Sequence, residues 1–61
     1  MNSLIFAQMV AHFGCQSDLA RQLNVTRSAV SQWRRRKRIP PAHAVKIEML
    51  SDGEFKAVDL V

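Results

Sequence analysis

The feature that most constrains the fold is a pair of short apolar stripes in the middle of the chain, separated by one polar corner. The first stripe predicts a helix over about residues 16–23 and the second predicts a helix over about residues 27–35. The stripes consist of Leu19, Ala20 and Leu23, then Ala29, Val30 and Trp33. Asn24 stands at the corner and is one of the few non-glycine residue types that tolerate positive φ. The small side chain of Ala20 permits a close crossing, so the pattern predicts a helix-turn-helix.

The start of the chain predicts a first helix over about residues 4–13, capped by Ser3 and ended by Gly14. Its apolar positions recur at helical spacing and are Leu4, Ile5, Met9, Val10 and Phe13. Cys15 or Ser17 then begins the second helix, and Thr26 is a suitable N-cap for the third. A secretion signal is disfavoured, because no Lys or Arg precedes Arg21 and the apolar run is far shorter than the ~20 residues that span a bilayer.

After the two central helices, Pro41 suits the first position of a fourth helix over about residues 41–50. The side chains expected to point inward from it are Ala44, Val45, Ile47 and Met49 or Leu50. Ser51-Asp52-Gly53 predicts a turn. Residues 54–61 fit a short helical turn or a strand, and we expect the helical turn. The predicted fold class is therefore all-α, a small single domain over residues 1–61 with four to five short helices.

Size and composition narrow the class of function. A chain of 61 residues has room for one small core, so a large catalytic cleft is not expected. The single cysteine, Cys15, excludes an internal disulfide. His12 and Cys15, with His43 as a third ligand, could be considered for zinc, but Gly14 breaks the first helix between them. We expect that the protein is not an enzyme and that it binds no metal, cofactor or small-molecule substrate.

Charge is distributed unevenly along the chain, although the formal net charge is only +4. No acidic residue lies between Asp18 and Glu48, whereas the last part of the chain is acidic. The cations of the central region are Arg21, Arg27, Arg34, Arg35, Arg36, Lys37, Arg38 and Lys46. Such a patch favours a polyanion, because neutralising phosphates releases condensed counterions. An anionic membrane surface would also attract it, so charge alone does not choose DNA.

Several segments resemble a known family. They are Gly14-Cys15-Gln16, Leu19-Ala20, Leu23-Asn24-Val25, the run from Ser28 to Trp33, and Ile39-Pro40. Together they are similar to the Cro repressors of lambdoid phages and the related YdaS-type prophage regulators, over about residues 10–59. Their most specific part is Ala-Val-Ser-Gln-Trp followed by basic residues and Ile-Pro. The chain departs in having Asn24 where the family often has glycine, and in the five consecutive basic residues after Trp33.

The resemblance implies a lambda-repressor-like fold and a cytoplasmic repressor that binds near-palindromic operators in double-stranded DNA, with no membrane partner. Resemblance and geometry both direct one set of side chains to base edges: Arg27, Ser28, Ser31 and Gln32. Arg27 suits guanine and Gln32 suits adenine. A second set is assigned to phosphates: Gln16, Thr26, Arg34, Arg35, Arg36, Lys37 and Arg38. The alternative for the basic run is a solvated loop, and for the serines an ordinary helix surface. Trp33 is expected in the core rather than stacked on a base.

Three functions remain open from the sequence: a transcriptional repressor, an antitoxin-like DNA-binding regulator, and a basic interaction module without sequence preference. A weak homodimer, completed on DNA, is expected because near-palindromic operators carry two half-sites. The first candidate for its interface is the segment 48–61, which carries Phe55, Val58, Leu60 and Val61. The alternative for this segment is that it covers the core.

Overall fold

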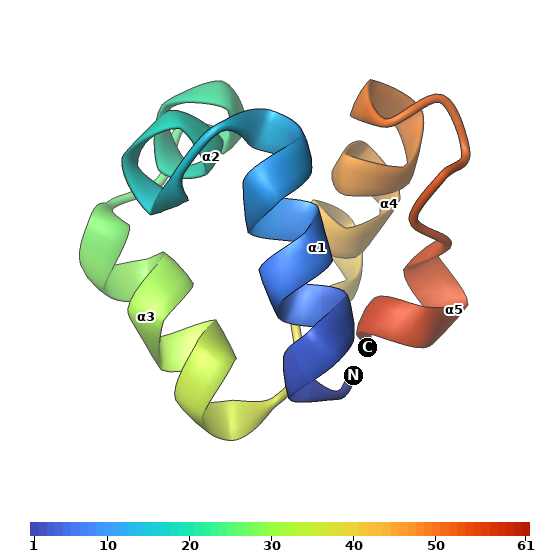
Figure 1. Cartoon of the computed structure of the whole chain (residues 1–61), viewed down its shortest axis with the longest axis horizontal. Helices are drawn as coiled ribbons and strands as arrows, with labels where there is room; N and C mark the ends of the chain where they lie inside the picture. The colour runs from blue at the N-terminus through green and yellow to red at the C-terminus, as the bar shows by residue number, and fades with distance from the viewer.

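Local signals set most of the helix ends. The computed structural model covers all 61 residues and contains five helices and no strand, which confirms the all-α class. The helices are α1 (Ser3–Phe13), α2 (Gln16–Leu23), α3 (Arg27–Arg36), α4 (Pro41–Leu50) and α5 (Ala57–Leu60). In Figure 1, α1 lies in the centre, with α2 and α3 on one side of it and α4 and α5 on the other. No helix combines the length and the apolar composition that crossing a bilayer requires.

The first helix begins one residue earlier than expected. The Asn2 side chain, not Ser3, caps it: Asn2 Oδ1 accepts a hydrogen bond from the Ile5 backbone N–H at 2.8 Å, and Ser3 is the first helical residue. The capping position needs an extended backbone and an acceptor side chain, and Asn2 has both. Gly14 ends the helix with φ 113°, and a Cβ there would lie 2.5 Å from the Asp18 carboxylate. The positive φ is what favours glycine at this corner, because the Asp18 carboxylate is the end of a flexible side chain and can move aside.

The ends of α2 and α3 follow the predicted signals. Asn24 closes α2 in the left-handed conformation, with φ 58° and ψ 44°. Thr26 caps α3 by accepting a hydrogen bond from the Ala29 backbone N–H at 3.1 Å. The third helix continues to Arg36, one residue beyond the expected end, because Lys37 is the residue that turns left-handed, with φ 58°.

The core is one cluster to which all five helices contribute. Its members are Phe6, Met9, Leu19, Ala20, Leu23, Val30, Trp33, Ile39, Ala44, Ile47 and Leu60. Trp33 is only 7% exposed and its ring lies 5.2 Å from that of His43, so its expected place in the core is confirmed.

The buried faces of two helices were predicted only in part from the sequence. In α1, Met9 is buried as expected, but Leu4 is 65% exposed and Phe6, which was not predicted, lies inside. In α4, Ala44 and Ile47 are buried as expected, but Val45, Met49 and Leu50 are exposed, and Met49 at 75% is the most exposed of the three. Residues two positions apart on a helix lie on roughly opposite sides, so Leu4 cannot share a face with Phe6, nor Met49 with Ile47.

The last eight residues fold back onto the body of the protein. The Ile39 backbone N–H donates to the Leu60 carbonyl at 2.7 Å, and the Ala57 N–H donates to Glu48 Oε1 at 2.7 Å. Ser51 Oγ accepts from the Phe55 N–H at 3.1 Å. These bonds fix α5 where the side chain of Leu60 completes the core. The helical alternative for this segment is therefore correct and the strand alternative is wrong.

Candidate nucleic-acid interface

The corner between α2 and α3 is held by apolar packing and by the turn itself. Ala20, Leu23 and Val30 are buried where the two helices meet. The Val25 backbone N–H donates to the Ala20 carbonyl at 2.9 Å, which tightens the turn after Asn24. Because the two helices are packed in this way, one face of α3 is turned away from the core and toward solvent.

The outward face of α3 carries the side chains that the sequence assigned to bases. Arg27, Ser28 and Gln32 are exposed. Ser31 is half-buried, and its hydroxyl donates a hydrogen bond to Gln16 Oε1 at 3.3 Å. The structure therefore connects a predicted base-reading residue with a predicted phosphate-contacting residue 15 positions away. Sequence reasoning chose both residues but had no signal for the contact between them.

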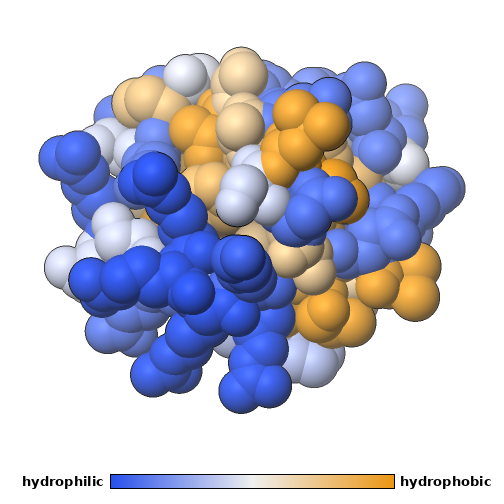
Figure 2. Space-filling model, turned by 60° about the horizontal axis from the view of Figure 1, so that its bottom comes forward, coloured by the Kyte–Doolittle hydropathy of each residue, from blue (hydrophilic) through white to orange (hydrophobic).

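The cations that follow Trp33 are exposed and carry no ion pair. The carboxylates that contact a basic side chain are Glu54, 3.0 Å from His12, and Asp18, which is paired with Arg21; both contacts lie outside α3 and the loop after it. The five exposed cations are Arg34, Arg35, Arg36, Lys37 and Arg38. Figure 2 shows long hydrophilic side chains projecting together from one side of the molecule. Since no carboxylate neutralises this run, its charge is available to an anionic partner.

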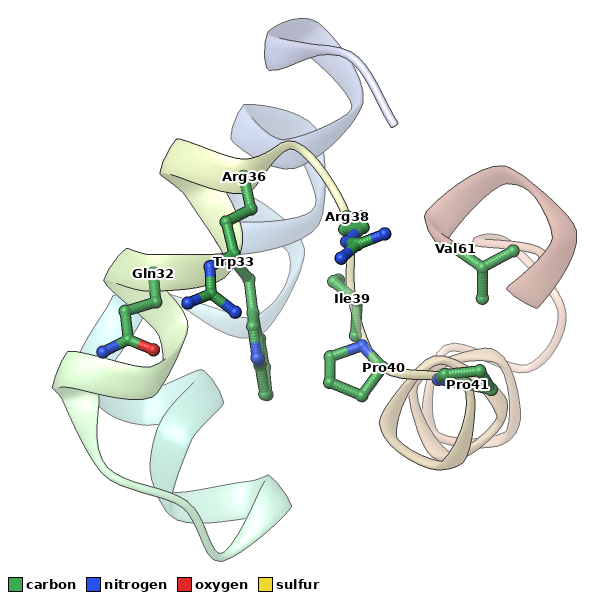
Figure 3. A pocket seen from close by; sticks show the side chains of 8 residues that line it. All are labelled: Gln32, Trp33, Arg36, Arg38, Ile39, Pro40, Pro41 and Val61. Carbon is green, nitrogen blue, oxygen red and sulfur yellow. The ribbon is translucent and has the colours of Figure 1, made fainter.

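A hollow lies on each side of the outward face of α3. On one side, Arg34 lines a hollow together with α1 and with Gly14, Cys15 and Gln16, which lead into α2. On the other side, Gln32, Trp33 and Arg36 line a second hollow together with the loop at Pro40, and Figure 3 shows the indole of Trp33 between Gln32 and Pro40. Both hollows are open and each is bordered by arginine, so each offers a cationic edge beside the exposed helix.

The three residues considered as zinc ligands, His12, Cys15 and His43, each contact a different side chain. His12 Nδ1 lies 3.0 Å from Glu54 Oε2, whereas the ring of His43 lies against Trp33. The exposed thiol of Cys15 donates to Asp18 Oδ2 at 3.4 Å. No three His, Cys, Asp or Glu side chains are grouped as metal ligands would be.

A helix-turn-helix with an exposed polar face on its second helix and a cationic edge on both sides of it defines a DNA-binding regulator. The chain matches the sequence profile of the family described as "DNA-binding transcriptional regulator Cro" over residues 6–60. It is 44% identical to the "Regulatory protein cro" of Pseudomonas phage D3 over 57 residues. This aligned segment covers 92% of this chain and 78% of the phage D3 protein. No solved structure matches it. The protein therefore belongs to the Cro family of DNA-binding transcriptional regulators.

Proposed function

We propose that this protein is a transcriptional repressor of phage or prophage origin that binds a short near-palindromic operator with α3 in the major groove. One observation carries the proposal: the exposed face of α3 presents Arg27, Ser28 and Gln32 to solvent, and none of their side chains forms an ion pair or a hydrogen bond within the protein. Its site of action is the DNA in the cytoplasm of a bacterial host.

Base recognition is assigned to the first two turns of α3. The guanidinium of Arg27 forms two hydrogen bonds with O6 and N7 of guanine, and the amide of Gln32 forms two with N6 and N7 of adenine. Ser28 lies between them on the same face. Ser31 contributes from the edge of this face, because its hydroxyl already donates to Gln16. Each two-point pairing discriminates against a wrong base by about 1–3 kcal/mol.

Phosphate binding is assigned to both sides of that face. Gln16 lies at the first position of α2, where free backbone N–H groups and the helix dipole favour an anion. Its hydrogen bond to Ser31 connects this position to the reading helix. Thr26, at the start of α3, and the cations at its end bind the backbone on either side and set the register; these cations are Arg34, Arg36, Lys37 and Arg38, and Arg35 is considered separately below.

The dimer is proposed to be weak in solution and complete on DNA, where two half-sites lie about one helical turn apart. Leu60 is buried and Phe55 packs against the core, so neither is free for a partner. The exposed large apolar residues of the candidate segment are Met49, Leu50, Val58 and Val61. The interface is therefore proposed to involve these four side chains. Val58→Asp should lower cooperative occupancy of a two-half-site duplex, whereas Leu4→Asp, at an exposed position of α1, should not; equal effects of both would remove this interface.

The central experiment is selection of bound duplexes from a random pool, followed by titration of the winner and of a scrambled duplex at several salt concentrations. A specific regulator should bind the selected near-palindrome about 10³-fold more tightly than the scramble. Gln32→Ala and Arg27→Ala should each lose discrimination at particular base pairs. Arg36→Ala should weaken binding to every duplex and lower the salt slope by about 0.9.

The matched control for Arg36→Ala is Lys56→Ala, which removes the same charge just before α5, a helix that lies apart from α3 (Figure 1), where Lys56 lines a hollow with Glu54 and Asp59. It should leave the salt slope unchanged. Equal losses on operator and random DNA for Gln32→Ala would refute the base-reading role.

The unpaired basic run also favours a second candidate, a basic module that binds nucleic acid or acidic protein without sequence preference. That candidate predicts no enrichment from the pool and equally salt-sensitive binding to selected and scrambled duplexes. A third, an antitoxin-like regulator, uses the same residues on DNA; co-purification of a toxin with the tagged protein from its native host would favour it.

A further inference from the structure

The basic run after Trp33 does not face in one direction. Arg34, Arg35 and Arg36 are the last three residues of α3, and consecutive residues on an α-helix point about 100° apart. Three adjacent arginines therefore extend into three different sectors around the helix axis. The three side chains therefore cannot all contact the same sugar–phosphate strand in the same way.

Two of the three arginines border the hollows described above. Arg34 lines the hollow that contains Gln16 and the start of α2. Arg36 lines the hollow on the other side of the helix, together with Arg38 of the following loop (Figure 3). These positions lie on the two flanks of the reading face, where the sugar–phosphate strands border the groove.

Arg35 borders neither hollow. It is exposed and lies seven residues after Ser28, four after Ser31 and three after Gln32. Residues at these spacings share one face of a helix. That face is opposite the buried side of α3 and is the one that carries the base-reading side chains.

We propose that Arg35 is a specificity-determining residue that reads a guanine, and not one of the phosphate contacts. The assignment rests on the proposed function, since it requires α3 to lie in the major groove. Arg35 is about 6 Å further along the helix than Ser31, at about 1.5 Å per residue. The base edges are contacted chiefly by the N-terminal part of a reading helix, so a long side chain is needed this far along. The guanidinium has that reach, and it offers two parallel donors to guanine O6 and N7. No carboxylate of the protein holds it elsewhere.

The test compares alanine variants of Arg34, Arg35 and Arg36, three identical changes at adjacent exposed positions of one helix. Each is titrated against the selected operator, a series with every base pair substituted in turn, and duplexes with 7-deazaguanine at each guanine. Arg34→Ala and Arg36→Ala should weaken all duplexes by the same factor and lower the salt slope by about 0.9 each. Arg35→Ala should abolish the preference for one guanine, which corresponds to a loss of discrimination on the order of 5- to 150-fold. Replacing that guanine by 7-deazaguanine should then no longer weaken the binding of this variant.

A further variant, Arg35→Lys, separates geometry from charge. Lysine keeps the positive charge but lacks the planar pair of donors, so this variant should lose most of the guanine preference while retaining the salt slope. If Arg35→Lys keeps full discrimination at every base pair and Arg35→Ala behaves like Arg36→Ala, the inference is wrong and Arg35 binds a phosphate.

The behaviour of Gln32→Ala separates a failure of the Arg35 assignment from a failure of the proposed function. If Gln32→Ala loses preference at one base pair while neither Arg35 variant does, only the assignment of Arg35 fails. If the wild-type protein selects no sequence at all, the proposed function fails, and this inference fails with it.

Discussion

Replacement of Leu60 by alanine should destabilise the protein severely although Leu60 is the next-to-last residue. Its side chain is fully buried, and its carbonyl accepts the Ile39 N–H at 2.7 Å. Leu-to-Ala changes in a core cost about 2–5 kcal/mol, because apolar contacts are lost and a cavity remains. A domain of this length has about 3–9 kcal/mol of stability, at about 0.05–0.15 kcal/mol per residue. The change therefore removes a large share of the total, and Tm should fall by at least about 8 °C.

The measurement is thermal unfolding followed by circular dichroism, and the matched control is Val58→Ala. Val58 lies in the same four-residue helix but is 78% exposed, so its replacement should change the free energy of unfolding by no more than about 0.5 kcal/mol. The loss at Leu60 should persist on tenfold dilution, because it belongs to the monomer core. A Leu60→Ala protein that melts within about 2 °C of the wild type, or a deficit that disappears on dilution, would contradict the place given to α5.

Three further changes probe the corner and the caps. Asn24→Ala should destabilise the protein by about 1 kcal/mol, because alanine is strained at left-handed φ, whereas Asn24→Gly should be as stable as the wild type in urea titrations; equal losses would refute the strain argument. Thr26→Ala should cost about 1 kcal/mol by removing the cap of α3, and Thr26→Ser should restore most of it in the same assay. A double-mutant cycle on Gln16 and Ser31, each changed to alanine, should give a coupling of about 0.5–1 kcal/mol in unfolding free energy; purely additive losses would show that their hydrogen bond contributes nothing.

Sequence reasoning succeeded best where the signals are local. A helix end depends on a few neighbouring residues, so Thr26, Gly14 and Pro41 predicted their helix boundaries to within one position. It was only partly correct for the buried faces of α1 and α4, because apolar residues occur all around both helices. Leu4 and Phe6 are equally apolar, and only the neighbouring helices decide which of them is inside.

Composition and short-range pattern thus determined the helical class and the two-helix corner at Asn24, and the resemblance of several segments to the Cro repressors indicated the family. The tertiary structure decided matters that join distant residues. It placed Leu60 in the core through a contact with Ile39, brought Gln16 to Ser31, and put Arg34 and Arg36 beside two different hollows, with Arg35 in neither. The physical reason is that helix signals act over about one turn, or roughly four residues, whereas the direction of a side chain in the folded protein depends on which partner buries the opposite face.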